Sequence, residues 1–179
     1  MANNCFYDMR ITGKKKNVEE MIQIIQGVGE FKHDSIGRVF DCCIVDDYSL
    51  ESAKNDDIVS IDVCGDCAWS IESSMLVNDR RNLLTETKRL NLIIEAYSSE
   101  PGCQFQEHVL INRGEVVIDA SVDYKEYWVQ EFDTIAEFNE EYGTNFTEDM
   151  VNENGDVCIG GFGDEYGVYE DHMKYFDEV

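Results

Sequence analysis

Carboxylates crowd the last third of the chain, well beyond the net charge of about 2–8 that keeps a small domain soluble. Residues 115–179 carry nineteen Asp and Glu against two Lys, which accounts for −17 of the formal net charge of −24. Eleven of these carboxylates are candidate partner-binding residues, namely Glu137, Glu140, Glu141, Glu148, Asp149, Glu153, Asp156, Asp164, Glu165, Glu170 and Asp171. Duplex DNA carries one charge per ~1.7 Å of its axis, so seventeen charges correspond to roughly 30 Å of duplex.

Aromatic residues are interleaved with these carboxylates. They are Tyr142, Phe146, Phe162, Tyr166 and Tyr169. Buried aromatic side chains are frequent anchors of protein interfaces, because they give up much apolar surface to a pocket of the partner. Acids with interspersed aromatics therefore indicate a folded surface that fits the nucleic-acid groove of a basic protein.

The cysteines do not form a metal-binding pattern. Cys64-Gly-Asp-Cys67 is the one C-x-x-C, and a zinc site needs a second pair of ligands. The only other close pair, Cys42-Cys43, would point to opposite faces of a strand. Seven cysteines without regular spacing fit a reducing compartment. We therefore expect mostly buried, reduced thiols and no bound metal.

Two loops resemble ligand-binding motifs but lack essential residues. Residues 152–156 resemble a calcium loop, yet the positions that need Asp and Glu are Met150 and Gly161. Gly160-Gly-Phe-Gly163 lacks the third glycine of a dinucleotide loop, because residue 166 is Tyr. The neighbouring acids would also repel a phosphate. We expect a tight turn here and no cofactor.

Catalytic constellations are weakly supported. The acids of the segment 41–62 could bind two metal ions, as in nucleases, but such an enzyme also needs a basic face for its polyanion; these acids are Asp41, Asp46, Asp47, Asp56, Asp57 and Asp62. His33, His108 and His172 are far apart in the sequence, with no nucleophile motif nearby. We expect a protein that is not an enzyme.

The composition excludes several classes of protein. With 14 Lys and Arg against 38 Asp and Glu, the chain is unsuited to bind nucleic acid or an anionic membrane directly. It has no run of about eighteen apolar residues, and residues 1–10 lack the layout of a signal peptide. These features predict a protein of the host-cell cytoplasm.

Hydrophobic periodicity predicts an α+β fold. Alternation predicts strands at 5–12, 38–45, 57–64 and 92–97, and apolar stripes of helical period predict helices at 17–27 and 75–90. The order β-α-β-β-α-β is that of a ferredoxin-like core, with both helices on one face of an antiparallel sheet. Residue Asn17 would begin the first helix, and residues 46–57 would form a long solvated connection.

The second half of the chain predicts an extension of this sheet. Strands at 106–111 and 115–124 are joined by Asn112-Arg113-Gly114, which is typical of a short hairpin. Thr134-Ile-Ala-Glu137 is a capping box that opens a short helix, and Gly143 ends it. We predict one domain over 1–143 and an irregular glycine-rich, acidic tail over 144–179 that packs on it through its aromatics.

Three segments resemble YubB-type ferredoxin-like proteins of plasmids and phages. They are Asn4-Cys5 with the strand ending Ile11-Thr12-Gly13, then Ala68-Trp69-Ser70, and finally 92–105, in which the strand 92–97 leads into Tyr97 to Phe105. The resemblance covers roughly 3–143. The chain departs from the family at Asn4, where the family has Trp, and at Ile71 and Glu72, where prolines are usual. The resemblance implies the fold and a mobile-element origin, but no activity.

Together these features predict a stoichiometric inhibitor that imitates nucleic acid. Its target would be a host defence nuclease, either a CRISPR effector or a restriction enzyme. Two alternatives stay open: a plasmid or phage ferredoxin-like module that binds a peptide or small molecule, and a metal-dependent hydrolase.

Overall fold

The chain forms one open, antiparallel sheet of seven strands in the order β2-β3-β1-β4-β5-β6-β7. The computed structural model describes residues 4–31, 41–45, 47–76, 82–163, 166–167 and 171–176. The strands are β1 (Asn4–Lys14), β2 (Cys43–Ile44), β3 (Ile58–Ala68), β4 (Ile93–Glu100), β5 (Phe105–Asn112), β6 (Glu115–Tyr127) and β7 (Val157–Gly160). The fold is therefore α+β, as the periodicity predicts.

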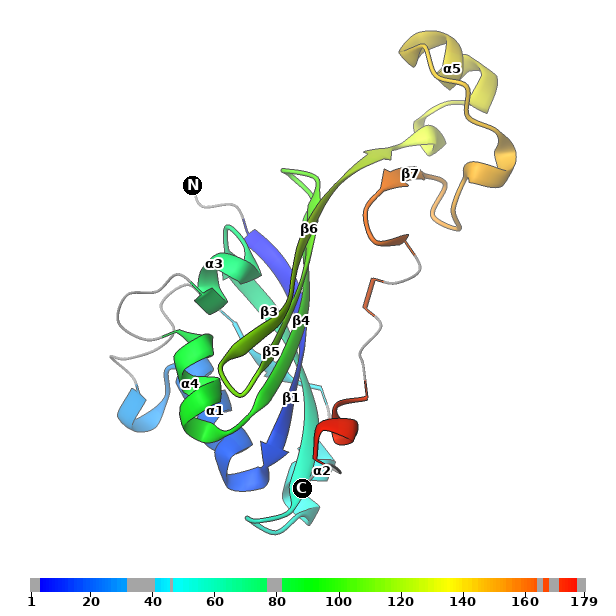
Figure 1. Cartoon of the computed structure of the whole chain (residues 1–179). Helices are drawn as coiled ribbons and strands as arrows, with labels where there is room; N and C mark the ends of the chain where they lie inside the picture. Colours follow the sequence, from blue (N-terminus) through cyan, green and yellow to red (C-terminus); the bar gives the residue numbers. More distant parts are fainter. Residues whose placement is uncertain are drawn as a thin grey trace.

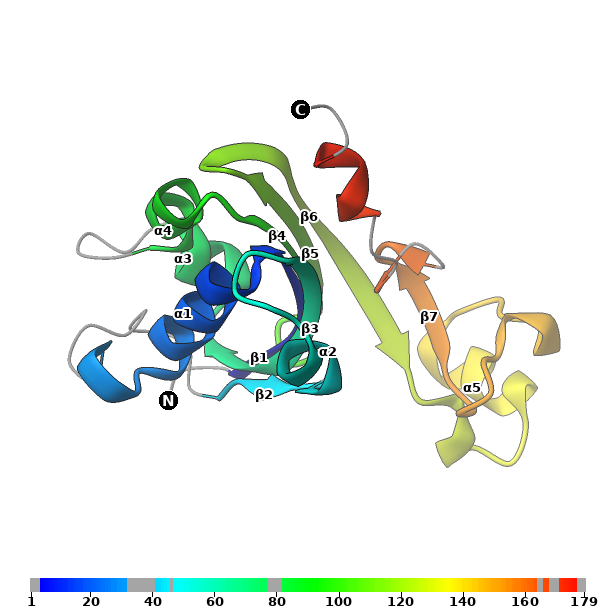
Figure 2. The same ribbon diagram turned by 90° about the horizontal axis from the view of Figure 1, so that it is seen from below.

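The helices between residues 15 and 90 cover one face of the sheet, whereas the helix at 135–142 lies away from it (Figures 1 and 2). The α-helices are α1 (Lys15–Gln26), α2 (Asp47–Ser52), α3 (Ile71–Leu76), α4 (Leu83–Leu90) and α5 (Ile135–Tyr142). Short 3₁₀ helices span Gly29–Phe31, Val129–Glu131, Glu148–Met150 and His172–Tyr175. No helix within the described ranges is long and apolar enough to cross a membrane.

The main core lies between the sheet and the helices of residues 15–90. On β1 the residues Cys5, Tyr7, Met9 and Ile11 are buried and alternate with residues of the opposite face. The apolar stripe of α1, which includes Met21, packs against them. This burial follows directly from the period of two along the strand and the helical stripe beside it.

The first helix begins at Lys15, so the predicted start at Asn17 is wrong. Lys14 precedes it without a side-chain cap. The free amides of the first turn are satisfied instead by a distant loop, because Lys15 N donates to Asp57 O (2.9 Å) and Lys16 N donates to Asn55 O (3.2 Å). A tertiary contact therefore takes the place of a local side-chain cap at this helix.

The predicted helix over 75–90 is confirmed only in its second half, because α3 and α4 are separate helices and residues 77–81 lie outside the described residues. Asn82 has an extended backbone (φ −133°), and its side chain caps α4 by accepting from Thr85 N at 2.8 Å. The start of α3 is held by β5, since Ile71 N donates to the buried Glu107 carboxylate at 2.9 Å. Each helix therefore has its own N-terminal acceptor.

The region 41–68 differs from its prediction in three ways. The connection 46–57 contains α2, whose Leu50 is buried in the main core. β2 is limited to Cys43–Ile44 among the described residues, and positions 38–40 of the predicted strand lie outside them. β3 continues through the whole C-x-x-C motif to Ala68. A Cβ at Gly65 would collide with the Asp41 carbonyl oxygen. The close approach of these two backbone segments therefore requires glycine at this position.

Local signals in the second half predict the structure well. Arg113 (φ 50°) and Gly114 (φ 87°) make the two-residue turn between β5 and β6. Thr134 caps α5 by accepting from Glu137 N, and Gly143 ends the helix in the left-handed conformation (φ 65°). Thus the hairpin, the Thr134 cap and the helix end at Gly143 are confirmed.

The C-terminal residues are more regular than predicted. β6 extends beyond its pairing with β5, and Tyr124–Tyr127 then pair with β7. Residues 128–157, here called the acidic lobe, form an excursion between these two strands. The lobe has a small core of Val129, Phe138, Phe146 and Val157, separate from the main one.

The last described segment returns to the sheet, on the face opposite α1, α3 and α4 (Figure 2). Phe162 N donates to the Gln106 side chain (2.9 Å), and Tyr166 packs edge-on against Tyr97 at 5.6 Å. Arg113 donates to the Tyr175 carbonyl (3.1 Å). Aromatic and polar contacts therefore fix this segment to β4, β5 and the β5–β6 turn.

Candidate partner-binding site

The acidic lobe projects from the sheet at the far end of β6 (Figure 1). It holds nine Asp and Glu and no Lys or Arg. Eight of the nine are exposed, and they are Glu131, Asp133, Glu137, Glu140, Glu141, Glu148, Asp149 and Glu153. Six of the eleven candidates from the sequence are therefore brought together on this lobe.

Two local structures position five of these six carboxylates, and Glu153 lies in the turn that follows. Glu137, Glu140 and Glu141 lie on α5, which Thr134 caps. Glu148 and Asp149 lie on the following 3₁₀ helix. The Thr147 hydroxyl, followed by the backbone amide of Asp149 itself, stabilises the charged form of the Asp149 carboxylate and lowers its pKa. Asp149 therefore keeps its negative charge under mildly acidic conditions.

The other candidates do not share this surface. Asp156 is buried, and its carboxylate lies 3.4 Å from Gln130 Nε2. Asp171 is exposed but caps the 3₁₀ helix His172–Tyr175 by accepting from Met173 N, far from α5 (Figure 1). Asp164, Glu165 and Glu170 lie outside the described residues. The candidates that the structure describes therefore do not form one continuous acidic face, because Asp156 is buried and Asp171 lies where the chain has returned to the sheet.

Two acids of the segment 41–62 contact neighbouring parts of the chain. Asp56 accepts from both Lys14 (3.2 Å) and Lys16 (3.3 Å). Asp57 accepts from the amide of Lys54 at 2.9 Å. The two ion pairs reduce the negative charge that Asp56 offers to a partner, in contrast to the carboxylates of the lobe.

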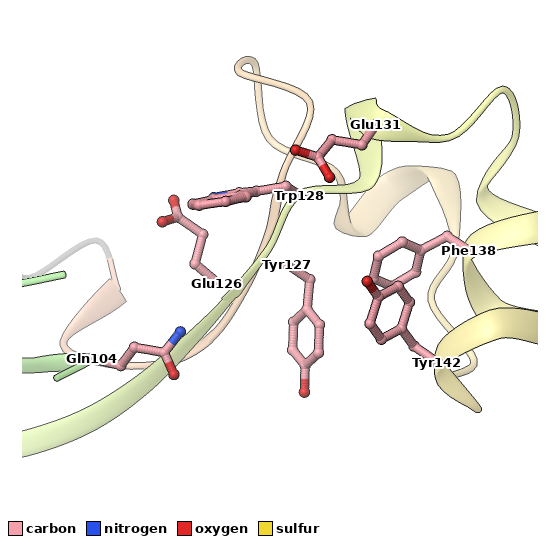
Figure 3. Close-up of a pocket in the computed structure, with 7 residues that line it drawn as sticks. All are labelled: Gln104, Glu126, Tyr127, Trp128, Glu131, Phe138 and Tyr142. Atoms are coloured by element: carbon pink, nitrogen blue, oxygen red, sulfur yellow. The ribbon is translucent and has the colours of Figure 1, made fainter. Parts of the chain in front are cut away.

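A cavity of about 290 Å³ lies where β6 enters the acidic lobe (Figure 3). We call it the aromatic pocket, and its lining consists of Gln104, Glu126, Tyr127, Trp128, Glu131, Phe138 and Tyr142. Trp128 and Tyr142 are each 58% exposed. The Phe138 and Tyr142 rings stack with their centroids 4.6 Å apart. In the view of Figure 3 the carboxylates of Glu126 and Glu131 flank the Trp128 indole.

The sequence pattern singles out only Tyr142 among these residues. The available signal was Tyr127-Trp128, an aromatic pair at the end of a strand and followed closely by acids. Rings beside carboxylates favour a cation, since the face of an aromatic ring is negative. The pocket can therefore hold a positively charged group.

Comparison with known proteins does not name a relative. No family model, curated protein or solved structure matches the chain. The proposals for its function accordingly rest on the lobe and the aromatic pocket.

A second polar cluster lies inside the molecule, between the sheet and the C-terminal segment. Glu95 Oε1 lies 2.7 Å from His108 Nε2 and Glu95 Oε2 lies 3.0 Å from His172 Nε2, while His172 Nδ1 lies 2.9 Å from the Thr12 hydroxyl. The side chains of Glu95 and His172 are fully buried. Two histidines that are distant in sequence therefore meet on one carboxyl group, and the cluster fastens the tail to the sheet.

The expected set of buried thiols is only partly correct. Cys5, Cys42 and Cys67 are buried. Cys64 is half-buried, and the exposed thiols are Cys43, Cys103 and Cys158. Across the parts of the chain that the structure describes, no group of three or more His, Cys, Asp and Glu is arranged to hold a metal ion.

Cys64 should react slowly with alkylating reagents at neutral pH. Burial, and then the negative charge of Asp8, raise the pKa of its thiol, so less thiolate is present than in an unperturbed cysteine. The thiol lines a cavity of about 300 Å³, so reagent can reach it. Its rate with iodoacetamide, followed by peptide mass spectrometry, should still be rising above pH 9. Asp8→Asn should accelerate it near pH 8, whereas a plateau below pH 9 would contradict the expected shift.

Proposed function

We propose that this protein inhibits a basic nucleic-acid-binding protein by placing its acidic lobe in the groove that normally holds DNA or RNA. The target class is a host defence nuclease, either a CRISPR effector or a restriction enzyme, and the inhibitor would act in the host-cell cytoplasm. The observation that carries the proposal is the lobe itself, which projects from the sheet with eight exposed carboxylates and no basic residue.

The charge of the lobe is large enough for this role. Eight exposed carboxylates correspond to about 14 Å of duplex at one charge per ~1.7 Å. Because no Lys or Arg lies within the lobe, its carboxylates keep their charge for a partner. A concentrated negative surface also accelerates encounter with a basic groove through electrostatic steering.

We further propose that β1–β4 with α1, α3 and α4 form a ferredoxin-like core that serves as the scaffold of the lobe. The antiparallel order β2-β3-β1-β4 supports this assignment, as do helices on one common face. The resemblance to YubB-type proteins supports an origin on a mobile element. In this proposal β5, β6 and β7 extend the core and carry the lobe away from it.

A second candidate is a module that binds a peptide or a small molecule, and the aromatic pocket favours it. Its cavity of about 290 Å³ combines aromatic walls with carboxylates. Such a module would depend on the pocket alone, whereas an inhibitor that imitates nucleic acid depends on the charge of the whole lobe.

The test compares two matched sets of charge removals. Glu137→Gln, Glu140→Gln and Glu141→Gln together remove three charges from the lobe. Glu115→Gln, Asp119→Asn and Asp123→Asn together remove three exposed charges from the neighbouring part of β6. A pull-down with nuclease-treated lysate supplies the partner, and binding is then measured between about 50 and 300 mM salt.

We expect the lobe variant to lose roughly 10- to 100-fold in affinity, because three exposed ion pairs contribute up to about 1 kcal/mol each. The β6 variant should bind nearly as the native protein does, and rising salt should weaken both. The lobe variant stays folded, since it removes like-charge pairs on α5 that cost a few tenths of a kcal/mol. Salt-insensitive binding that survives loss of the lobe charges would rule out mimicry of nucleic acid.

A further inference from the structure

We propose that the aromatic pocket binds the guanidinium group of an arginine side chain. The inference rests on the proposed function in one respect, that the arginine belongs to the partner protein. The site itself can be tested without that partner.

The arrangement of the pocket matches a planar cation. The Trp128 indole offers an exposed aromatic face, and a cation within about 6 Å of such a ring is attracted by its quadrupole. The carboxylates of Glu126 and Glu131 flank this ring in Figure 3. A guanidinium stacked on the indole can therefore donate its N–H groups to carboxylates beside the ring plane.

Within the described part of the chain, no Lys or Arg forms an ion pair with these carboxylates, Glu126 and Glu131. Glu126 Oε1 accepts a long contact from the Cys158 thiol (3.9 Å). The sequence contains no Lys or Arg between Lys125 and Lys174, so a cation for this pocket must come from outside that stretch.

Arginine fits better than lysine for a physical reason. A guanidinium is planar, presents its donors as a fork and is more weakly hydrated than an ammonium group, so it both stacks on a ring and pairs with carboxylates. The size of the cavity agrees, since about 290 Å³ lies at the lower end of the ~300–1,000 Å³ typical of small-molecule sites. A single side chain fits, and the pocket is small for a nucleotide.

The experiment uses the fluorescence of Trp128. The chain has two tryptophans, so Trp69→Phe leaves Trp128 as the only indole. This variant is titrated with N-acetyl-arginine amide at constant ionic strength. The corresponding amides of lysine and glutamine serve as an ammonium probe and a neutral probe.

We expect saturable emission changes with arginine amide, with Kd in the millimolar range, as for a single side chain. Lysine amide should bind at least threefold more weakly and glutamine amide should not saturate. Glu126→Gln with Glu131→Gln, in the Trp69→Phe background, should weaken arginine binding about tenfold while circular dichroism stays unchanged. Equal responses to arginine and glutamine amides, or an affinity that is unchanged without the two carboxylates, would overturn the proposal.

The same measurements separate this inference from the proposed function. If arginine amide fails to bind but partner binding still depends on Glu137, Glu140 and Glu141, the pocket proposal is wrong and the inhibitor proposal stands. If arginine amide binds while no partner depends on the lobe charges, the site is correct and the inhibitor proposal is wrong.

Discussion

Replacing His172 with alanine is expected to release the C-terminal segment from the sheet and to lower the free energy of unfolding by about 2–4 kcal/mol. The fully buried Glu95 carboxyl would lose one of its two histidine partners, and Thr12 would lose its contact with the ring. Loss of one hydrogen-bond partner in the interior leaves part of the desolvation cost of the carboxyl group uncompensated. Release of the tail limits this loss, because water can then reach Glu95.

Urea denaturation gives the total loss, and hydrogen exchange locates it. The amides of 172–176 should exchange much faster in His172→Ala, while those of α1 stay protected. Met173→Ala is the matched control, since Met173 is the exposed neighbour and its truncation should change stability by less than about 0.5 kcal/mol. Unchanged exchange in 172–176 together with an unchanged urea midpoint would show that the Glu95 cluster does not hold the tail.

Replacing Phe138 with alanine is expected to unfold the acidic lobe while the sheet stays intact. Phe138 is 2% exposed and lies at the centre of the lobe core, where its ring contacts Tyr142, Phe146 and Phe132. Truncating a buried Phe to Ala costs about 3–5 kcal/mol. The lobe core consists of four buried residues and is separate from the main core, so the loss should melt the lobe locally.

Limited proteolysis followed by mass spectrometry tests this directly. New cleavages should appear within 128–157, whereas fragments covering β1–β4 should persist. Binding to the partner should fall as well, because an unfolded lobe no longer holds its carboxylates in place. Phe138→Leu, which keeps most of the volume, should cost under about 1.5 kcal/mol and leave the lobe resistant. Cooperative unfolding of the entire chain would show that the lobe and the sheet are one folding unit.

Local pattern was sufficient for much of the sheet. The alternation of Cys5, Tyr7, Met9 and Ile11 predicts β1 because side chains of a strand alternate between two faces. The turn at Arg113-Gly114 and the cap at Thr134 are likewise encoded within a few neighbouring residues. Each of these features depends on contacts that are short in sequence, so the sequence alone determines them.

Elements whose hydrogen-bond partners are distant in sequence could not be predicted from local pattern. The start of α1 depends on the carbonyls of Asn55 and Asp57, and the start of α3 depends on Glu107. β7 is only four residues long and is a strand because Tyr124–Tyr127 offer it an edge. No periodicity within a segment records which remote segment will supply its hydrogen bonds.

The same distinction between local pattern and long-range contacts applies to the candidate sites. Composition alone determined that the last third is strongly acidic and poor in cations. Only the tertiary structure decided that Glu137 and Glu153 share a lobe, that Asp156 is buried inside it and that Asp171 lies elsewhere. It also brought His172 to Glu95, 77 positions away in the sequence. Hydrophobic periodicity indicates which face of an element is apolar. Which other element covers that face depends on packing over the whole chain.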